Sequence, residues 1–256
     1  MSIKQYHESD NIDTFVPNTI YEPAKELCIH RHYWGPNKSV LSIIENRCSE
    51  YTNVLEIGPG VNPFKCATHF IGMNEKLSDY VSVDIDKDVF PFETNYFDFI
   101  YCRHVMEDIQ NPDFAISEMI RTSRGGYIET PSPMIEITKN VDAMEFSPLY
   151  CGYIHHRYIV WSNIQKNEIY FLPKYSFILD QLMKLSDTSA QLINHLINNY
   201  PVYWNNYFLF NSQTTVIMYK QGIHFSMPTG YIDLVLRSVQ ESIANTDYFV
   251  QHILNK

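Results

Sequence analysis

Four short apolar runs recur in the first half of the chain, each of the length of a buried strand. They are Val54–Ile57, Tyr80–Ile85, Phe97–Cys102 and Gly126–Thr130. Between the last two, residues 112–121 carry apolar side chains at helical spacing, namely Phe114, Ile116, Met119 and Ile120. Continuous apolar strands that alternate with helices predict an α/β fold, in which a mostly parallel sheet carries helices on its faces.

Residues 1–50 predict an irregular lead followed by a helix. Ser39 is a candidate cap for a helix from Val40 to about Ser49, because an apolar stripe follows it. The stripe consists of Val40, Leu41, Ile43, Ile44 and Cys48. A further short helix is expected near residues 23–30.

The pattern changes after residue 131, where two prolines end a strand. The runs YIHHRYIVW and EIYFLPKY predict two strands joined by a polar turn, and residues 176–199 predict a helix. After Pro201, YWNNYFLF and TTVIMYK predict an antiparallel hairpin, and the tail from Tyr231 predicts a helix. Without a repeat or linker, we predict a single domain over residues 1–256, with residues 131–200 inserted between the fifth and sixth strands.

Composition limits the classes of partner and compartment. The chain has 19 Lys+Arg against 29 Asp+Glu, a net charge of −10, which disfavours binding to nucleic acid. Five scattered cysteines without a CxxC pair favour reduced thiols in the cytoplasm over disulfides or a zinc–cysteine site. No run approaches the ~18 apolar residues of a membrane span, and the start lacks the pattern of a signal peptide. We therefore expect a soluble protein.

The stretch VLEIGPGVNPF places a glycine-rich turn directly after the first strand. In open parallel sheets, ligands bind beyond the carboxyl ends of the strands. Gly58 and Gly60 would permit a positive φ and let a ligand approach the main chain, and Glu56 near the strand end could meet a cationic or hydroxyl group. Alone, this pattern also fits an ordinary tight turn.

Two downstream segments make the turn more specific. VLEIGPG, PFETNYFDFIYCRHVMED and SRGGYIET follow one another over about residues 51–131. In this order and spacing the chain resembles the class I S-adenosylmethionine-dependent methyltransferases, in the small-molecule (methyltransferase type 11-like) branch. The resemblance implies a Rossmann-like sheet with an antiparallel C-terminal hairpin, and S-adenosylmethionine as the cofactor.

The resemblance also implies cofactor-binding residues. Glu56, Gly58, Pro59 and Gly60 match the glycine turn and its strand acid. The family places another acid after the second strand, where it binds the ribose, but here only 30 residues (61–90) separate Gly60 from the PF motif. Either Asp84 is that acid, or residues 68–72 form a short second strand. In the second register, which we favour, Asn74 stands near the missing acid, and Asp84 and Ile85 frame the adenine.

Residues after the fourth strand would face the cofactor and the acceptor. Arg103 could pair with the cofactor carboxylate or a substrate anion, or else form a surface ion pair with Glu107 or Asp108. His104 lies one helical turn from these acids and could pair with them, in a catalytic or a structural role.

Methyl transfer to a hydroxyl needs an aligned acceptor and a general base. The candidate base is His155, with Glu107 or Asp108 as its partner, although a histidine pair bonded to backbone in a hairpin is the alternative. A strand would aim His155 and His156 to opposite sides, so no metal site is predicted.

Aromatic residues are plentiful over residues 150–210, and aromatic faces with polar rims suit sugar rings, although such residues also build cores. We therefore expect an O-methyltransferase that acts on a small-molecule acceptor, a nucleotide sugar or a glycan hydroxyl, and that could form a homodimer. The alternatives are another small molecule or a lipid as acceptor, or a non-catalytic partner protein with this fold. A nicotinamide-dependent dehydrogenase is disfavoured, because Pro63 stands where GxGxxG needs its third glycine.

Overall fold

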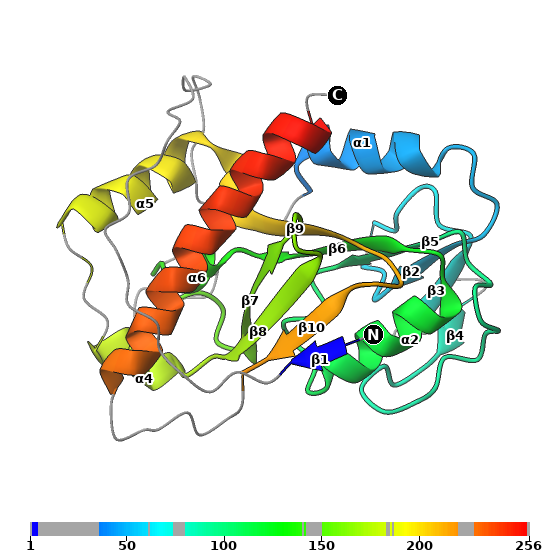
Figure 1. Ribbon diagram of the computed structural model, residues 1–256, viewed down its shortest axis with the longest axis horizontal. Coiled ribbons are helices and arrows are strands. Elements are labelled where there is room, and N and C mark those ends of the chain that lie inside the picture. The colour runs from blue at the N-terminus through cyan, green and yellow to red at the C-terminus, as the bar shows by residue number, and fades with distance from the viewer. Residues whose placement is uncertain are drawn as a thin grey trace.

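The computed structural model describes residues 2–4, 36–60, 62–73, 80–139, 141, 150–182, 185, 187–219 and 228–254. The helix expected near residues 23–30 lies outside them. Figure 1 shows two sheets and the helices that cover them.

The larger sheet has six strands. In spatial order they are β4 (Tyr80–Ser82), β3 (His69–Gly72), β2 (Val54–Ile57), β5 (Phe99–Arg103), β6 (Gly126–Pro131) and β9 (Asn205–Phe210). The first five are mutually parallel, and β9 pairs with β6 in the antiparallel sense. After β4 the chain returns to the centre of the sheet, where β5 pairs with β2 on the side opposite β3. This order confirms the Rossmann-like α/β fold.

Two strands fit between the glycine turn and the PF motif because both are short. β3 is His69–Gly72, nearly the second strand of the register that we favoured, and β4 is Tyr80–Ser82. Asp84 therefore follows the third strand of the sheet in chain order. Asn74 lies outside the described residues.

The smaller sheet has four strands. In spatial order they are β1 (Ser2–Lys4), β10 (Thr215–Met218), β8 (Glu168–Pro173) and β7 (Tyr158–Asn163). The predicted pair of strands in the insertion is confirmed as the antiparallel hairpin β7–β8.

The predicted C-terminal hairpin is wrong, because β10 pairs in parallel with β8 and not with β9. Asn167, in the turn of the β7–β8 hairpin, explains the change. Its side-chain amide donates to Oδ1 of Asn211 at 2.9 Å, and its Oδ1 accepts from Oγ1 of Thr214 at 3.0 Å. Its carbonyl accepts from the backbone N–H of Thr215 at 3.0 Å. These contacts bind the β9–β10 connection to the smaller sheet.

Helices cover both faces of the larger sheet (Figure 1). α1 (Lys38–Cys48) packs on one face with the π-helical turn η4 (Val250–Leu254), and α2 (Pro112–Thr122) packs on the other. Asn37, not Ser39, caps α1: its Oδ1 accepts from the N–H groups of Ser39 and Val40 at 3.1 and 3.3 Å. The predicted stripe is confirmed by the burial of Val40, Ile44 and Cys48.

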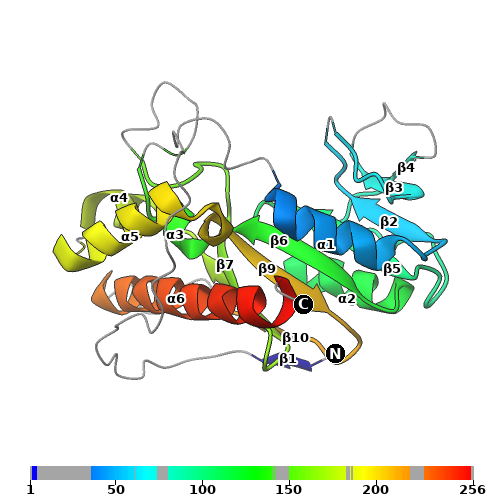
Figure 2. The ribbon, with the colours of Figure 1, turned by 90° about the horizontal axis from the view of Figure 1, so that it is seen from above.

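The remaining helices of the described residues lie after residue 131. They are α3 (Pro133–Glu136), α4 (Ser176–Leu182), α5 (Asp187–Asn199), the 3-10 helix η3 (Pro201–Trp204) and α6 (Pro228–Phe249). The single helix predicted over residues 176–199 is therefore two helices. α6 runs along the smaller sheet and contacts β7 (Figure 2).

The smaller sheet packs on the same face of the larger sheet as α2. Val160, Phe171 and Val216 from the smaller sheet share one hydrophobic core with Ile57 and Ile100 from the larger. This shared core brings the residues that precede β7 to the carboxyl edge of the parallel strands.

Candidate active site

The glycine turn lies at the carboxyl end of β2. Gly58 has φ +65°, and its N–H donates to the carbonyl of Ile71 at 2.9 Å. A Cβ at Gly58 would lie 2.6 Å from Cγ2 of Val105, whereas one at Gly60 would meet nothing within 4 Å. Both glycines are exposed, and Pro59 between them is buried. The bare backbone fits a ligand that approaches the main chain closely.

Glu56, in β2, holds the segment after this turn. Its side chain is 5% exposed, and its Oε2 accepts from the backbone N–H of Phe64 at 2.8 Å. The Phe64 ring stacks on Tyr101, with centroids 4.2 Å apart. Burial raises the pKa of Glu56 to about 7, although the Phe64 N–H and the charge of Arg103 oppose the rise.

Glu129 is a buried acid that we did not select from the sequence. Its Oε1 accepts from Nε of Arg103 at 3.0 Å and from Nδ2 of Asn205 at 2.7 Å, and its Oε2 accepts from the Tyr127 hydroxyl at 2.6 Å. Of the alternatives for Arg103, neither names this partner: the guanidinium pairs with a buried carboxylate of the next strand. The signal for Glu129 was available: like Glu56, it is an acid at the end of an apolar run.

Asp84 and Ile85 lie in the turn after β4. Asp84 forms an ion pair with Lys87 at 2.7 Å, and hydrogen bonds from Lys87 and the Asp86 N–H lower its pKa. Ile85 is buried in the core that α2 shares with the two sheets. Their role beside an adenine ring stays a prediction.

A tight turn after β5 carries the predicted catalytic acids. His104 has φ +53°, and its Nδ1 lies 3.3 Å from Oε1 of Glu107. The Glu107 side chain is 1% exposed, and no described residue hydrogen-bonds either of its oxygens. The backbone N–H of Asp108 donates to the carbonyl of Val105 at 3.1 Å. Asp108 is therefore one short turn away from the Val105 side chain that covers Gly58.

His155 and His156 precede β7 and lie in a turn, not in a strand. The expectation that a pleat aims them to opposite sides is therefore wrong. Nε2 of each histidine lies 3.8 Å from Oδ1 of Asp108. The side chain of His155 is 59% exposed and that of His156 is 4% exposed. The structure thus brings together the predicted pair His155 and Asp108 and adds His156, which we had not placed in the site.

Two residues that we also did not select, Glu136 and Lys174, form a chain of contacts on the Nδ1 side of His156. Oε1 of Glu136 lies 2.6 Å from Nδ1 of His156, and its Oε2 accepts from Nζ of Lys174 at 2.6 Å. Burial opposes ionisation of Glu136, but Lys174 and His156 hold its pKa below the ordinary value. The pKa of Asp108 is raised, mainly by burial, with the charges of Glu107 and Glu136 adding to the rise and those of the two histidines opposing it. Glu136 and Lys174 gave only a weak signal in the sequence, because Glu136 lies in an apolar run (PMIEI) and Lys174 follows a strand end (YFLPK).

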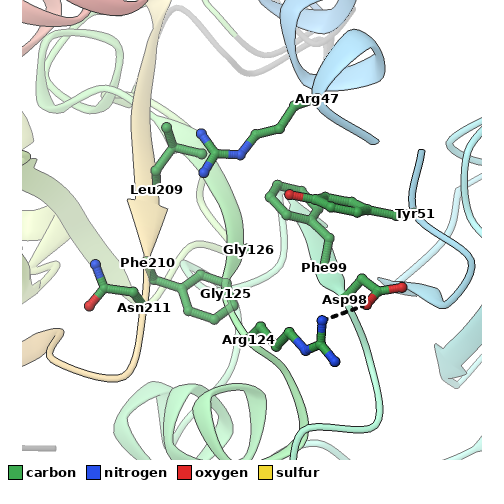
Figure 3. Close-up of a pocket in the computed structure, with 10 residues that line it drawn as sticks. All are labelled: Arg47, Tyr51, Asp98, Phe99, Arg124, Gly125, Gly126, Leu209, Phe210 and Asn211. Carbon is green, nitrogen blue, oxygen red and sulfur yellow. Dashed lines mark ion pairs between the residues drawn. The ribbon is translucent and has the colours of Figure 1, made fainter. Parts of the chain in front are cut away.

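A cavity of about 280 Å³ lies at the opposite edge of the larger sheet, where the parallel strands begin (Figure 3). It is lined in part by Phe99 and Gly126, the first residues of β5 and β6. Arg47 and Arg124 also line it, and Arg124 lies 3.4 Å from Asp98. This cavity is not at the carboxyl edge, where the glycine turn and the histidines are.

With this geometry in place, comparisons with known proteins give the class. Residues 40–128 match the family model described as "Methyltransferase domain". The matched residues contain the glycine turn, the turn at Val105–Asp108 and the start of β6, and the match supports a class I methyltransferase domain of the type 11 branch. The cofactor that such a domain implies is S-adenosylmethionine. The exposed backbone at Gly58 and Gly60 fits it, with Glu56 beneath the turn.

Solved structures similar to this chain include three methyltransferases. A SAM-dependent methyltransferase of Thermotoga maritima, titled a possible histamine N-methyltransferase, is 19% identical over 40% of this chain and 52% of its own, with a TM-score of 0.31. A putative methyltransferase of Bacillus halodurans is 18% identical over 36% and 46%, with a TM-score of 0.29. An S-adenosylmethionine-dependent methyltransferase of Mesorhizobium loti is 13% identical over 57% and 72%, with a TM-score of 0.29.

The chain spans about half the length of the first of these structures. TM-scores this low support no conclusion about this chain, so the family assignment depends on the match over residues 40–128. Among curated proteins, no sequence matches the chain. Within the part of the chain that the structure describes, no helix is long and apolar enough to cross a membrane.

Proposed function

We propose that this protein is an S-adenosylmethionine-dependent O-methyltransferase that acts on a sugar hydroxyl, in a nucleotide sugar or in a glycan. The observation that carries the proposal is the turn after β5. Val105 contacts the glycine turn, and Asp108 at the other end of the same turn faces two histidines at 3.8 Å. Groups that can accept a proton therefore stand beside the expected position of the cofactor.

The position of each site residue suggests its role in binding the cofactor or in accepting the proton. Gly58 and Gly60 would hold the cofactor against the main chain, and Glu56 would keep that segment in place through Phe64. The bound cofactor supplies an electrophilic methyl group. His155 is the exposed member of the histidine pair, so an acceptor hydroxyl can reach it, and the Asp108 carboxylate 3.8 Å away would stabilise the charge that the ring gains with a proton.

The case for a sugar rests on one aromatic residue. Trp161, Tyr203 and Trp204 are buried in the core, so they offer no face to an acceptor. Tyr153 is half-buried beside the histidines, with its ring centroid 5.6 Å from that of His155. An aromatic face next to a proton acceptor suits a sugar ring that presents a hydroxyl.

Two measurements test the proposal. Calorimetry with S-adenosylhomocysteine should show binding; no binding would favour a non-catalytic protein with this fold. Incubation with methyl-labelled cofactor and a panel of nucleotide sugars and glycans should label a sugar. Label transferred only to a lipid or to another small molecule would reject the sugar. A cytoplasmic location and a homodimer are further parts of the proposal, which cell fractionation and light scattering test.

A further inference from the structure

Three side chains that bind metals in proteins converge beside the carboxyl edge. One ring nitrogen of His155, one of His156 and a carboxylate oxygen of Asp108 all lie within 4.8 Å of one another. Two imidazoles and a carboxylate suit Zn²⁺ and its neighbours in the first transition row. We propose that these residues form a site for a divalent transition-metal ion, with Zn²⁺ as the first candidate. We call it the His–His–Asp site.

The spacing of the three atoms is that of ligands around an ion. At 3.8 Å, both Nε2–Oδ1 distances are too long for a hydrogen bond. Zinc bonds of about 2.0–2.1 Å in tetrahedral geometry place neighbouring ligand atoms about 3.3 Å apart. Closing the gap takes about half an ångström per contact, a distance that small rotations of the exposed His155 side chain and of the partly exposed Asp108 side chain provide.

A carboxylate behind His156 orients it as metal-binding histidines are usually oriented. Glu136 lies 2.6 Å from Nδ1 of His156 and is itself fixed by Lys174, whose side chain is fully buried. With its Nδ1 proton donated to this carboxylate, His156 can offer Nε2, which lies 3.8 Å from Oδ1 of Asp108, to an ion that displaces the second ring proton. Such an arrangement fixes the tautomer and the ring orientation before an ion binds.

The local charge also calls for a cation. Glu107, Asp108 and Glu136 place three carboxylates beside the histidine pair, and of these Glu136 is paired with the ammonium group of Lys174. Among the described residues, none donates a hydrogen bond to either oxygen of Glu107 or to Oδ1 of Asp108. Buried carboxylate oxygens without donors are costly, and a divalent ion would offset that cost.

The chemistry of such an ion rests on the proposed function. Three protein ligands leave a position open on a tetrahedral ion. An acceptor hydroxyl bound there would lose its proton more readily, because the positive charge stabilises the oxygen anion. The O–H bond breaks, the proton leaves to solvent past the exposed His155, and the oxygen keeps the electron pair. The ion would thus take over the work of a general base.

Metal binding is tested without any activity measurement. After treatment with EDTA and desalting, the full chain is titrated with Zn²⁺ by calorimetry, and its melting temperature is measured with and without Zn²⁺. We expect one Zn²⁺ per chain and a higher melting temperature. His155→Ala should weaken binding by at least about 10–100-fold, the loss seen when even an outer-shell partner is removed. Because His155 is 59% exposed, this variant should fold.

Matched variants separate the site from adventitious binding. His195→Ala removes an exposed histidine of α5 and should bind Zn²⁺ like the unaltered protein. Asp108→Asn keeps the shape of the carboxylate and should weaken binding as His155→Ala does. Absence of Zn²⁺ binding, or equal affinity in all four proteins, would overturn the proposal.

Methyl-transfer assays with and without EDTA then separate the two proposals. Zinc bound at this site in a protein that transfers no methyl group would leave the metal site standing and reject the proposed function. Transfer that persists at full rate in a chain shown to hold no metal would support the methyltransferase and overturn the catalytic role of the ion.

Discussion

Burial of Glu56 makes the stability of the fold depend on pH. The pKa of its carboxyl rises from 4.5 to about 7, mainly because of burial. Since the folded-state pKa lies above the unfolded one, the folded chain keeps a proton that the unfolded chain loses between pH 4.5 and pH 7. Stability from this group is therefore complete below pH 4.5 and is lost as the pH rises to about 7.

The magnitude follows from the difference between the two pKa values. Each pKa unit corresponds to about 1.4 kcal/mol, so the free energy of unfolding should fall by about 3 kcal/mol across this window. Glu56→Gln removes the titration and keeps an oxygen for the Phe64 N–H. In a chain of this size, about 3 kcal/mol corresponds to about 6–12 °C in melting temperature.

The assay is urea denaturation of the cofactor-free protein, followed by tryptophan fluorescence, at steps from pH 4.5 to pH 8. The stability of Glu56→Gln relative to the unaltered protein should rise with pH and level off above about pH 7. Glu50→Gln, at an exposed position, should follow the unaltered protein at every pH. Parallel curves for Glu56→Gln and the unaltered protein would refute the reasoning, since they would mean that Glu56 ionises as it does in water.

Three further substitutions test the glycine turn, a helix cap and the shared core. Gly58→Ala places a methyl group 2.6 Å from Val105 at a positive φ. Calorimetry should show that this variant binds S-adenosylhomocysteine at least about tenfold more weakly than the unaltered protein. Gly230→Ala, whose new methyl group meets nothing within 4 Å, should bind it normally. Asn37→Ala removes the acceptor for two N–H groups of α1 and should lower the free energy of unfolding by about 1 kcal/mol, measured by urea denaturation. Phe171→Ala empties a fully buried site between the two sheets and should lower the free energy of unfolding by about 3–5 kcal/mol. Calorimetry should still show one unfolding transition, and two separate transitions would contradict a shared core.

Local pattern was sufficient to predict the buried strands of the larger sheet's core and the class of this protein. The runs at Val54–Ile57 and Gly126–Thr130 are strands because continuous apolar segments are stable only when both faces are covered. The glycine turn could also be predicted from the sequence, because Gly58 adopts a positive φ that other residues avoid. Together with the order of the later motifs, these features identified the methyltransferase fold before any contact was known.

Contacts between segments far apart in the chain decided the rest. The pairing of β10 with β8 depends on Asn167 meeting Asn211 and Thr214, more than 40 positions away. Likewise Glu136, in α3, reaches His156, and Lys174, which follows β8, reaches Glu136. Spacing along the sequence describes which way a side chain points within one helix or strand, but not which element packs against it. The sequence by itself therefore determined the sheet and its glycine turn, whereas tertiary packing alone decided which charged groups would meet at its edge.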